Sequence, residues 1–335
     1  MIRGSRILLL IDRECLLAED PDMRRAATRK HAPMEFHLAR TLRELGCAMT
    51  LHAFTSLGRL RRELDARWPD VVFNVTEHVN GKRADDARIV DALESWGVAY
   101  TGATAAGLAL CRDKALSKSI AAAAGLLVPQ FAVVCAGAPP PDTLPPLPAI
   151  VKPVARDSSE GIHMSSIART PEALRRRIEV VQRRYREPAI VEAFIDGVDV
   201  HAGVVETPRL RVLPPRELVI ERSGTDAPLV ASYHVKHNDD YRARWGIRTS
   251  AARLPRAARH RMARDVAALW PLLSLRDYAR IDFRLDREGR LWFIEANPNP
   301  GITYRSQCGT WEAVAYPDLV RWILRRALAR RRTAA

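Results

Sequence analysis

The stretch RIDFRLDREGRLWFIEANPNPG, residues 280–301, carries the pattern of a β-hairpin. Its first half alternates polar and apolar residues as far as Asp286, which is the period of two expected of a half-buried strand. A polar turn follows and ends in Gly289, and the apolar, aromatic-rich run 291–294 has high strand propensity. The sequence therefore predicts two antiparallel strands joined by a tight turn.

Polar side chains gather on one face of this predicted hairpin. A turn closed between residues 286 and 289 puts Phe293 opposite Asp282 and puts Glu295 opposite Arg280. Because side chains alternate along each strand, one face then carries residues 280, 282, 284, 291, 293, 295 and 297.

The residues Asp282, Glu295 and Asn297 therefore converge on that face. Two carboxylates and an amide supply the oxygen ligands that suit Mg²⁺, which keeps its other positions for water and substrate phosphates. The alternative from the pattern alone is a surface hairpin whose polar face is simply solvated.

Composition bounds the class of protein. The chain has 335 residues and is 47% hydrophobic, which is enough for more than one core and predicts two or three domains. The longest uncharged run, 120–141, contains Gly125, Pro129 and Gly137, unlike a membrane span. The apolar run 7–11 is too short for a secretory signal. We expect a cytoplasmic protein with no membrane partner.

The charge pattern argues against nucleic acid as a partner. The formal net charge is +14, which suits either nucleic acid or an anionic substrate. The arginine runs lie in predicted helices at 175–177 and 183–184 and in the tail at 325–332. No aromatic residues alternate with them, so solvated helix faces are the better interpretation. Nine histidines without an HExxH pattern and widely spaced cysteines also argue against zinc.

The N-terminal part predicts an open parallel sheet. Strands at 6–12, 49–54 and 70–74 alternate with helices at 35–46 and 57–67. Ligands of such sheets bind beyond the carboxyl ends of the strands. This edge would hold Asp12 to Glu14 and the segment 74–80. No Gly-x-Gly-x-x-Gly follows the first strand, so a dinucleotide site is not supported.

The remaining elements read along the chain as follows. Helices are expected at 84–96 and 103–111, and Asp113 is placed to cap a helix that runs to Gly125. Beyond a proline-rich connector, the expected elements are strands at 149–153 and 162–165, a helix at 172–186, a strand-turn-strand unit at 189–199, a lid-like loop at 233–241, and helices at 256–270 and 319–329.

A lysine ends the strand at 149–153 beside a loop of small residues. A point charge next to backbone donors suits phosphate binding. A solvated lysine at a strand end fits this pattern equally well.

Taken together, these motifs resemble the ATP-grasp ligases, specifically the D-alanine–D-alanine ligase branch. The resemblance covers roughly residues 72–306 and rests on Asp-Lys at 113–114, Val-Lys-Pro at 151–153, Ser-Ser-x-Gly at 158–161, Val-Glu-x-Phe-Ile-x-Gly at 191–197, Arg-x-Asp-Phe at 280–283 and Glu-x-Asn-x-x-Pro-Gly at 295–301. It implies an α/β fold with an N-terminal open parallel sheet followed by an ATP-grasp pair of domains. The implied divisions are 1–112 on the substrate side, 113–200 with the phosphate-covering loop, and 201–335 with the metal site. It also suggests a homodimer.

The resemblance implies an ADP-forming reaction in which ATP phosphorylates a carboxylate and an amine attacks the acyl phosphate. The protein then acts mainly by positioning and charge neutralisation. ATP and Mg²⁺, with Mn²⁺ as the alternative metal, are the implied cofactors, and amino acids or small peptides are the implied substrates.

The family roles transfer to matching positions of this sequence. Lys114 and Lys152 correspond to lysines that hold phosphates, and Lys236 to a lid lysine that reaches the transferred phosphate. Arg280 corresponds to the residue that stabilises the tetrahedral intermediate. The remaining assignments are Ser158, Ser159 and Gly161 in the covering loop, Glu192, Ala193, Phe194 and Ile195 at adenine, Asp199 at ribose, Asp282, Glu295 and Asn297 as metal ligands, and Gly301 and Ser306 at the second substrate.

Departures from the family concentrate in the substrate half. Asp157 stands where the covering loop usually has glycine, and Asp12-Arg13-Glu14-Cys15 stands in place of a Glu-x-x-Val-Ser-like motif. The segment 76–86 replaces the usual His-Gly-x-x-Gly-Glu-Asp-Gly. We therefore expect the same chemistry on a different carboxylate or amine. The alternatives are strict D-alanine–D-alanine ligation, ligation to a protein or ribosomal partner, and a catalytically inactive nucleotide-binding scaffold.

Overall fold

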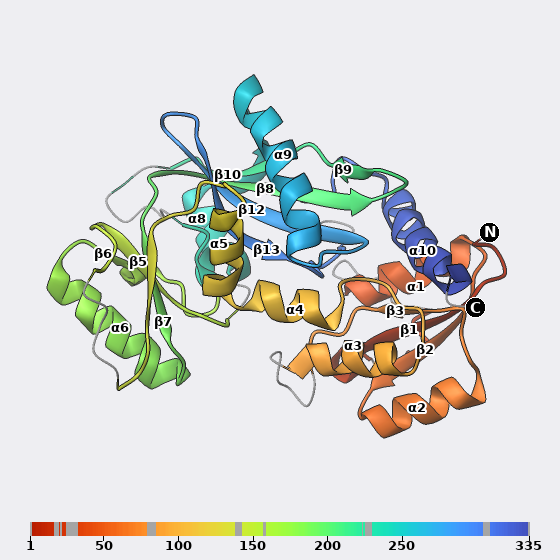
Figure 1. Cartoon of the computed structure of the whole chain (residues 1–335). Coiled ribbons are helices and arrows are strands. Elements are labelled where there is room, and N and C mark those ends of the chain that lie inside the picture. Colours follow the sequence, from red (N-terminus) through yellow and green to blue (C-terminus); the bar gives the residue numbers. More distant parts are fainter. Residues whose placement is uncertain are drawn as a thin grey trace.

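The computed structural model describes residues 2–16, 20, 22–24, 33–78, 85–137, 143–156, 159–222, 224, 230–303 and 309–333. Within these residues the strands form three sheets (Figure 1). The N-terminal sheet lies at one end of the molecule, a larger antiparallel sheet lies in the middle, and a small antiparallel sheet lies at the other end. The predicted α/β class, with a parallel sheet followed by antiparallel sheets, is confirmed.

The N-terminal sheet is parallel, in the order β2-β1-β3. Its strands are β1 (Arg6–Asp12), β2 (Ala48–Phe54) and β3 (Val71–Asn74). The run Ile7 to Ile11 is buried on both faces, as expected of a central parallel strand. One face packs on α1 (Met34–Glu44) and the other on α2 (Leu57–Ala66), α3 (Asp86–Ser95) and α4 (Ala105–Arg112).

The small sheet has the order β4-β7-β5-β6. It consists of β4 (Phe131–Val134), β5 (Ala149–Pro153), β6 (Ile167–Ala168) and β7 (Ala189–Ala193), and α6 (Pro171–Tyr185) covers one face of it. The helix α5 (Lys114–Ala123) precedes this sheet, and the carboxylate of Asp113 accepts from the backbone N–H groups of Ala115 and Leu116, as the predicted cap requires.

The strand predicted at 162–165 is wrong. The chain forms a 3-10 turn at Met164–Ser166 before the short β6. The hydroxyl of Ser166 accepts from the backbone N–H of His163 and donates to the carbonyl of Gly161, which closes a turn instead of an extended strand.

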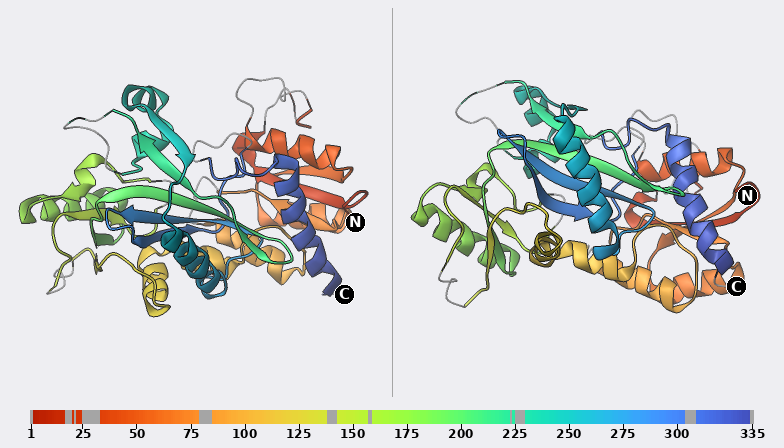
Figure 2. Two further views of the ribbon diagram at one scale, coloured as in Figure 1. Left: turned by 90° about the horizontal axis from the view of Figure 1, so that it is seen from above. Right: turned by 45° about the horizontal axis from the view of Figure 1, so that its top comes forward.

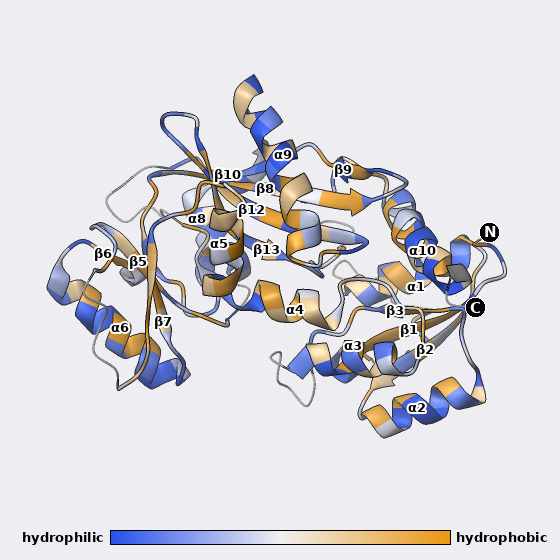
Figure 3. Ribbon diagram, viewed as in Figure 1, coloured by the Kyte–Doolittle hydropathy of each residue, from blue (hydrophilic) through white to orange (hydrophobic). Residues whose placement is uncertain are grey.

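The middle sheet has the order β11-β10-β8-β12-β13, and β9 also pairs with β8. Its strands are β8 (Gly197–Glu206), β9 (Leu210–Val212), β10 (Arg216–Ile220), β11 (Ile247–Ala251), β12 (Tyr278–Asp286) and β13 (Leu291–Asn297). The helix α9 (Arg256–Leu272) packs on the sheet through Met262, Val266 and Leu269. Apolar residues predominate along these strands, whereas α2 and α6 alternate between apolar and polar residues (Figure 3).

The loop predicted at 233–241 is also wrong. Two short helices, α7 (Tyr233–His237) and α8 (Asp239–Trp245), occupy this segment. The side chain of Ser232 accepts from the backbone N–H of Val235, and that of Asn238 accepts from the N–H of Tyr241, so each helix begins at a polar cap. The absence of an apolar period hid two helices that are each only one or two turns long.

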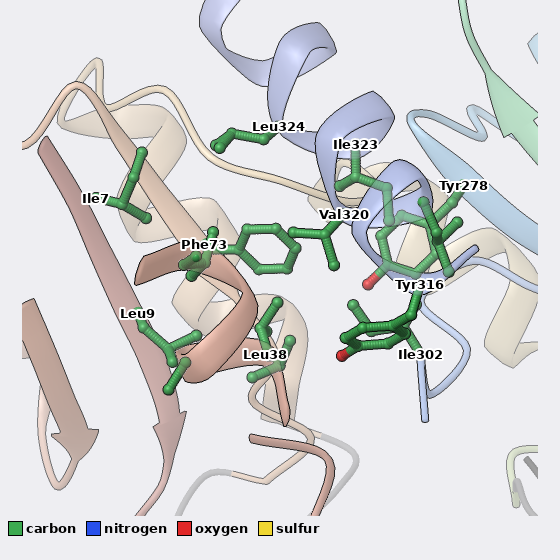
Figure 4. Packing of buried hydrophobic residues seen from close by; sticks show 14 of the residues in the cluster. Ile7, Leu9, Leu38, Phe73, Tyr278, Ile302, Tyr316, Val320, Ile323 and Leu324 are labelled. Carbon is green, nitrogen blue, oxygen red and sulfur yellow. The ribbon is translucent and has the colours of Figure 1, made fainter. Parts of the chain in front are cut away.

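The last helix, α10 (Tyr316–Thr333), returns to the N-terminal sheet. Its residues Val320, Ile323 and Leu324 are fully buried in one cluster with Ile7 and Phe73 (Figure 4). The view from above and the tilted view also show α10 beside this sheet (Figure 2). Tyr278 of β12 and Val205 of β8 belong to the same cluster, so one core joins the N-terminal sheet to the middle sheet.

The division into 1–112, 113–200 and 201–335 stays a prediction, and its second boundary would fall inside β8. In the described part of the chain, no helix is both long and apolar enough to cross a membrane.

Candidate active site

A β-bulge in the β12–β13 hairpin sets the arrangement of the polar residues. Near the turn, Phe293 pairs with Phe283, whereas further along Glu295 pairs with Asp282 and Asn297 with Arg280. The register shifts between Asp282 and Phe283, so Ile294 is an extra residue in β13. The predicted pairing of Asp282 with Phe293 and of Arg280 with Glu295 is therefore wrong.

The predicted convergence of Asp282, Glu295 and Asn297 nevertheless holds, because the bulge restores it. Without the extra residue, Ile294 would lie opposite Asp282, and Glu295 would point to the other face of the sheet. The predicted place of Leu291 and Phe293 on the polar face is wrong, since both are buried in the core with Phe283. The turn is one residue longer than predicted: Asp286 pairs with Arg290 instead of Gly289, since the N–H of Asp286 donates to the carbonyl of Arg290 and the N–H of Gly289 donates to the carbonyl of Asp286, both at 3.0 Å.

Three side chains hold the buried carboxylate of Asp282. Arg280 donates to both of its oxygens, from Nε at 2.7 Å and from Nη2 at 2.9 Å. The Nδ1 atom of His201 lies 3.1 Å from Oδ1, and the amide of Asn297 donates to Oδ2 at 3.3 Å. Burial alone would raise the pKa of Asp282, but Arg280 and His201 outweigh it and hold that pKa far below its usual range.

A pocket lies between the small sheet and the middle sheet, with walls from β5 and β7 on one side and from β8, β12 and β13 on the other. Many of the predicted site residues line it: Lys152, Ser159, Glu192, Ala193, Phe194, Ile195, Asp199, Lys236, Asp282 and Glu295. Other predicted residues, Lys114, Gly161, Arg280, Asn297 and Gly301, do not line it. Ser158 and Ser306 lie outside the described residues.

The carboxylate of Glu192, which lines the pocket, pairs with two lysines. Its Oε2 lies 3.0 Å from Nζ of Lys152 and 3.4 Å from Nζ of Lys118, and both Glu192 and Lys118 are inaccessible to solvent. Burial alone would raise the pKa of Glu192, but the two ammonium groups reverse the effect and lower it. Burial lowers the pKa of Lys118 to about 8, although Glu192 opposes the change. The other carboxylate oxygen, Oε1, is buried and has no hydrogen-bond partner.

The segment after Glu192 is fixed by Arg284 of β12. Its guanidinium donates to the carbonyl of Ile195 at 2.6 Å and to that of Gly197 at 3.0 Å, and it forms an ion pair with Asp199 at 2.8 Å. The same guanidinium lies over the ring of Phe194, 5.0 Å from its centroid. Arg284 thus connects the β12–β13 hairpin to the segment from Phe194 to Asp199.

Ser159 contacts the segment before α7. Ser159 is buried with a positive φ of 61°, and its hydroxyl donates to the carbonyl of Ala231 at 2.6 Å. The N–H of Ala231 in turn donates to Asp199 at 3.1 Å. Lys114 is buried outside the pocket, where its ammonium donates to the carbonyl of Arg156 at the start of the loop.

The edge predicted to bind substrate lies at strand ends of the N-terminal sheet. The carboxylate of Asp12, at the end of β1, accepts from the backbone N–H groups of Glu77 and His78 and contacts Nδ1 of His78 at 3.0 Å. After β13, the carbonyl of Gly301 accepts a hydrogen bond from Nε1 of Trp311 at 2.9 Å. The next residue, Ile302, donates its backbone N–H to the sulfur of Met34 at the start of α1.

The sequence interpretation missed three site residues, Lys118, His201 and Arg284. Lys118 is four residues after Lys114 on one helix, so it lies on the same helix face. His201 follows Asp199 by two residues on β8, and Arg284 follows Asp282 by two on β12, so each shares a sheet face with a predicted site residue. These spacings were visible, but each residue type also fits an ordinary structural role.

A pocket between two antiparallel sheets, with a carboxylate-bearing hairpin in its wall, is typical of the ATP-grasp class of ligases. The sequence profile described as "D-ala D-ala ligase C-terminus" matches residues 142–325. The chain therefore belongs to the D-alanine–D-alanine ligase family, which comprises ATP-dependent, ADP-forming carboxylate–amine ligases.

Individual relatives agree with this assignment. A protein of Gluconobacter oxydans named D-alanine–D-alanine ligase is 33% identical over 274 residues, which are 80% of this chain and 84% of that protein. An uncharacterised protein of Sinorhizobium fredii, y4sG, is 31% identical over 242 residues, which are 72% of this chain and 68% of that protein.

Solved structures show the same fold over the whole chain. The D-alanine–D-alanine ligase of Bacillus anthracis in complex with ATP has a TM-score of 0.71 at 17% identity, with 99% of this chain and 100% of that chain covered. The ligase of Coxiella burnetii has a TM-score of 0.67 at 16% identity, with coverage of 99% and 96%.

Proposed function

We propose that this chain binds ATP and a divalent cation in the pocket between β5–β7 and β8–β12–β13 and joins an amino acid or small peptide carboxylate to an amine. The observation that carries the proposal is the presence of both positively and negatively charged side chains in one pocket. Lys152 and Lys236 face it as cations, and Asp282 and Glu295 face it as carboxylates. That combination suits a triphosphate together with a metal ion.

The part of the pocket around Glu192 fits an adenine ring. The buried, unpartnered Oε1 of Glu192 is an acceptor that an exocyclic amino group can satisfy. The apolar side chains of Phe194 and Ile195 and the aliphatic Ile294 also line the pocket. Asp199, further along, is a hydrogen-bond acceptor suited to ribose hydroxyls.

The hairpin face fits a hard cation. Asp282, Glu295 and Asn297 offer carboxylate and amide oxygens, which is the donor set that Mg²⁺ prefers. Among the described residues, none donates a hydrogen bond to Glu295, so its carboxylate is available. The same residues contain no ready-made group of three His, Cys, Asp or Glu side chains for a metal. The site therefore relies on Asn297 and on substrate oxygens, as expected for Mg²⁺ rather than zinc.

The side chains act mainly on charge. When bound, the cation would neutralise phosphate oxygens and favour loss of the terminal phosphoryl group. Lys152 and Lys236 neutralise the phosphate chain, and Ser159 covers it from the loop. We assign to Arg280 the stabilisation of the oxyanion that forms when the amine attacks the acyl phosphate. Lys114 positions the covering loop through the carbonyl of Arg156.

The substrate pair is proposed to differ from two molecules of D-alanine. The carboxylate of Asp12 is already occupied by two backbone N–H groups and by His78. A carboxylate occupied in this way holds the segment after β3 at the end of β1 and is less available to a substrate ammonium group. Strict D-alanine–D-alanine ligation is the second candidate, which the name of the Gluconobacter relative favours. The substrates would bind between this edge and Gly301.

The homodimer implied by the resemblance and the cytoplasmic location expected from the sequence stay proposals. Size-exclusion chromatography with light scattering tests the first, because a monomer at micromolar concentration would contradict it.

The test of function is ADP release with pairs of amino acids, D-alanine with D-alanine among them, followed by mass spectrometry of the product. Asp282→Asn and Glu295→Gln should lower the rate by at least about 100-fold, the equivalent of several kcal/mol of lost charge stabilisation. Glu288→Gln, an exposed carboxylate in the turn of the same hairpin, is the matched control and should leave the rate unchanged. Full activity in both pocket variants would contradict the site. A D-alanyl-D-alanine product would favour the second candidate.

A further inference from the structure

Lys118 is buried at the junction of three elements and is not explained by phosphate binding. Its side chain has no solvent exposure and does not line the pocket. It extends from α5 toward β7 and β13, where it contacts Glu192 and the carbonyl of Ile294. Burying a lysine costs folding free energy unless its ammonium is paired and hydrogen-bonded. The contacts of Lys118 therefore indicate which groups it stabilises.

The contact to β13 falls on the bulge. Nζ of Lys118 donates to the carbonyl of Ile294 at 2.7 Å, and Ile294 is the extra residue of the strand. One residue earlier, the N–H of Phe293 donates to the carbonyl of Leu127 at 2.8 Å. Backbone groups at the bulge are therefore satisfied by α5 and the segment after it.

The bulge decides which side chains face the pocket. Ile294 takes the extra position in β13, so Glu295 pairs with Asp282 and shares its face of the sheet. If the bulge moved along β13 by one residue, Glu295 would turn toward the core and away from Asp282. The position of the candidate metal ligand thus depends on the contact that fixes Ile294.

We propose that Lys118 is a positioning residue that pins the β13 bulge and so holds Glu295 beside Asp282, while the same ammonium pairs with Glu192. This inference rests on the proposed function, because Glu295 matters here as a metal ligand. It assigns no contact with substrate to Lys118. It predicts that removing this buried cation weakens metal binding more than nucleotide binding, since Lys152 still pairs with Glu192 at 3.0 Å.

The test measures Mn²⁺ binding by the purified full-length chain. Electron paramagnetic resonance of free Mn²⁺ gives the metal dissociation constant at saturating ADP, and calorimetry with EDTA present gives the dissociation constant of ADP alone. Lys118→Met should weaken Mn²⁺ binding by about 10- to 100-fold, the usual effect of losing a group that orients a metal ligand. The affinity for metal-free ADP should fall by a smaller factor.

Two further variants separate positioning from general damage to the fold. Val266→Ala opens a cavity in the apolar cluster under the same sheet and should lower the thermal midpoint while leaving Mn²⁺ affinity unchanged. Lys118→Gln removes the charge and shortens the donor, and it replaces Lys118→Met if that variant does not fold. It too should weaken Mn²⁺ binding at least about tenfold.

The outcomes distinguish this inference from the proposed function. If the wild-type chain binds Mn²⁺ with ADP and a folded Lys118 variant binds it equally well, the role of Lys118 is wrong and the proposed function stands. Equal losses for Mn²⁺ and for metal-free ADP would also overturn the role, because they indicate a general disturbance of the pocket. If the wild-type chain binds no Mn²⁺ in the presence of ADP, the proposed metal site and the inference fall together.

Discussion

The substitution Glu192→Gln would leave two ammonium groups in the interior without their shared counter-ion. Nζ atoms of Lys152 and Lys118 lie 3.0 and 3.4 Å from the carboxylate that is removed. Breaking a buried ion pair by removing one partner typically costs about 3–5 kcal/mol. Lys118 has another way to respond, because its pKa is already lowered to about 8. Releasing its proton at pH 7 costs on the order of 1 kcal/mol, the value of one pKa unit.

The cost should therefore depend on pH, and its sign follows from the protons bound. Without Glu192 the pKa of Lys118 falls further, since the carboxylate is the group that raises it and Lys152 opposes it. Between pH 6 and pH 8 the folded variant then binds fewer protons than the folded wild type, while the unfolded chains keep the lysine protonated. The stability of the variant rises more steeply with pH. We expect a deficit that is larger at pH 6 than at pH 9 by about 1–3 kcal/mol.

The assay is urea unfolding followed by tryptophan fluorescence at pH 6, 7.5 and 9. Glu288→Gln removes an exposed carboxylate and should change the free energy of unfolding by less than about 0.5 kcal/mol at each pH. A deficit for Glu192→Gln that stays constant from pH 6 to pH 9, or grows, would refute the account of Lys118 as the group that yields its proton. Glu295 is the other nearby carboxylate that acts on Lys118, and it is unchanged in both variants.

Two other substitutions probe the frame around the pocket. Arg284→Lys keeps the charge but loses the planar guanidinium that reaches Ile195, Gly197 and Asp199. The dissociation constant for ADP, measured by calorimetry, should therefore rise about tenfold or more. An unchanged constant would show that this segment keeps its shape without the guanidinium. Ile323→Ala empties part of the core under α10 and should lower the free energy of unfolding by about 2–5 kcal/mol in urea, with ADP affinity retained; a loss below 0.5 kcal/mol would mean that the core closes around the gap.

The sequence predicted the parallel sheet because its strands are long apolar runs between helices with a clear period. β1 shows this best, since every residue from Ile7 to Ile11 is buried. The hairpin was predicted at the right place, but its turn is one residue longer than predicted and a bulge shifts the pairing again beyond it. A bulge is fixed by contacts from another element, here Lys118 and Leu127, and no local pattern in β13 records those contacts.

The errors at 162–165 and 233–241 share a physical origin. Both segments form turns or short helices held by side-chain hydrogen bonds, from Ser166 in one case and from Ser232 and Asn238 in the other. Such bonds replace the apolar period as the determinant of structure. Lys118 escaped notice because a lysine one helical turn after Lys114 is most often on a solvated face. Only the packing of α5 on β13 shows that it is buried.

The return of α10 to the N-terminal sheet has a consequence for synthesis of the chain. β3 ends at Asn74, but the helix that buries part of its sheet begins at Tyr316. At about 5–20 residues per second, translation of the intervening segment takes roughly 10–50 s. During that time Ile7 and Phe73 lack one side of their core. Nascent chains arrested before residue 316 should therefore remain open to protease within the first three strands, and only the release of the last helix would close them.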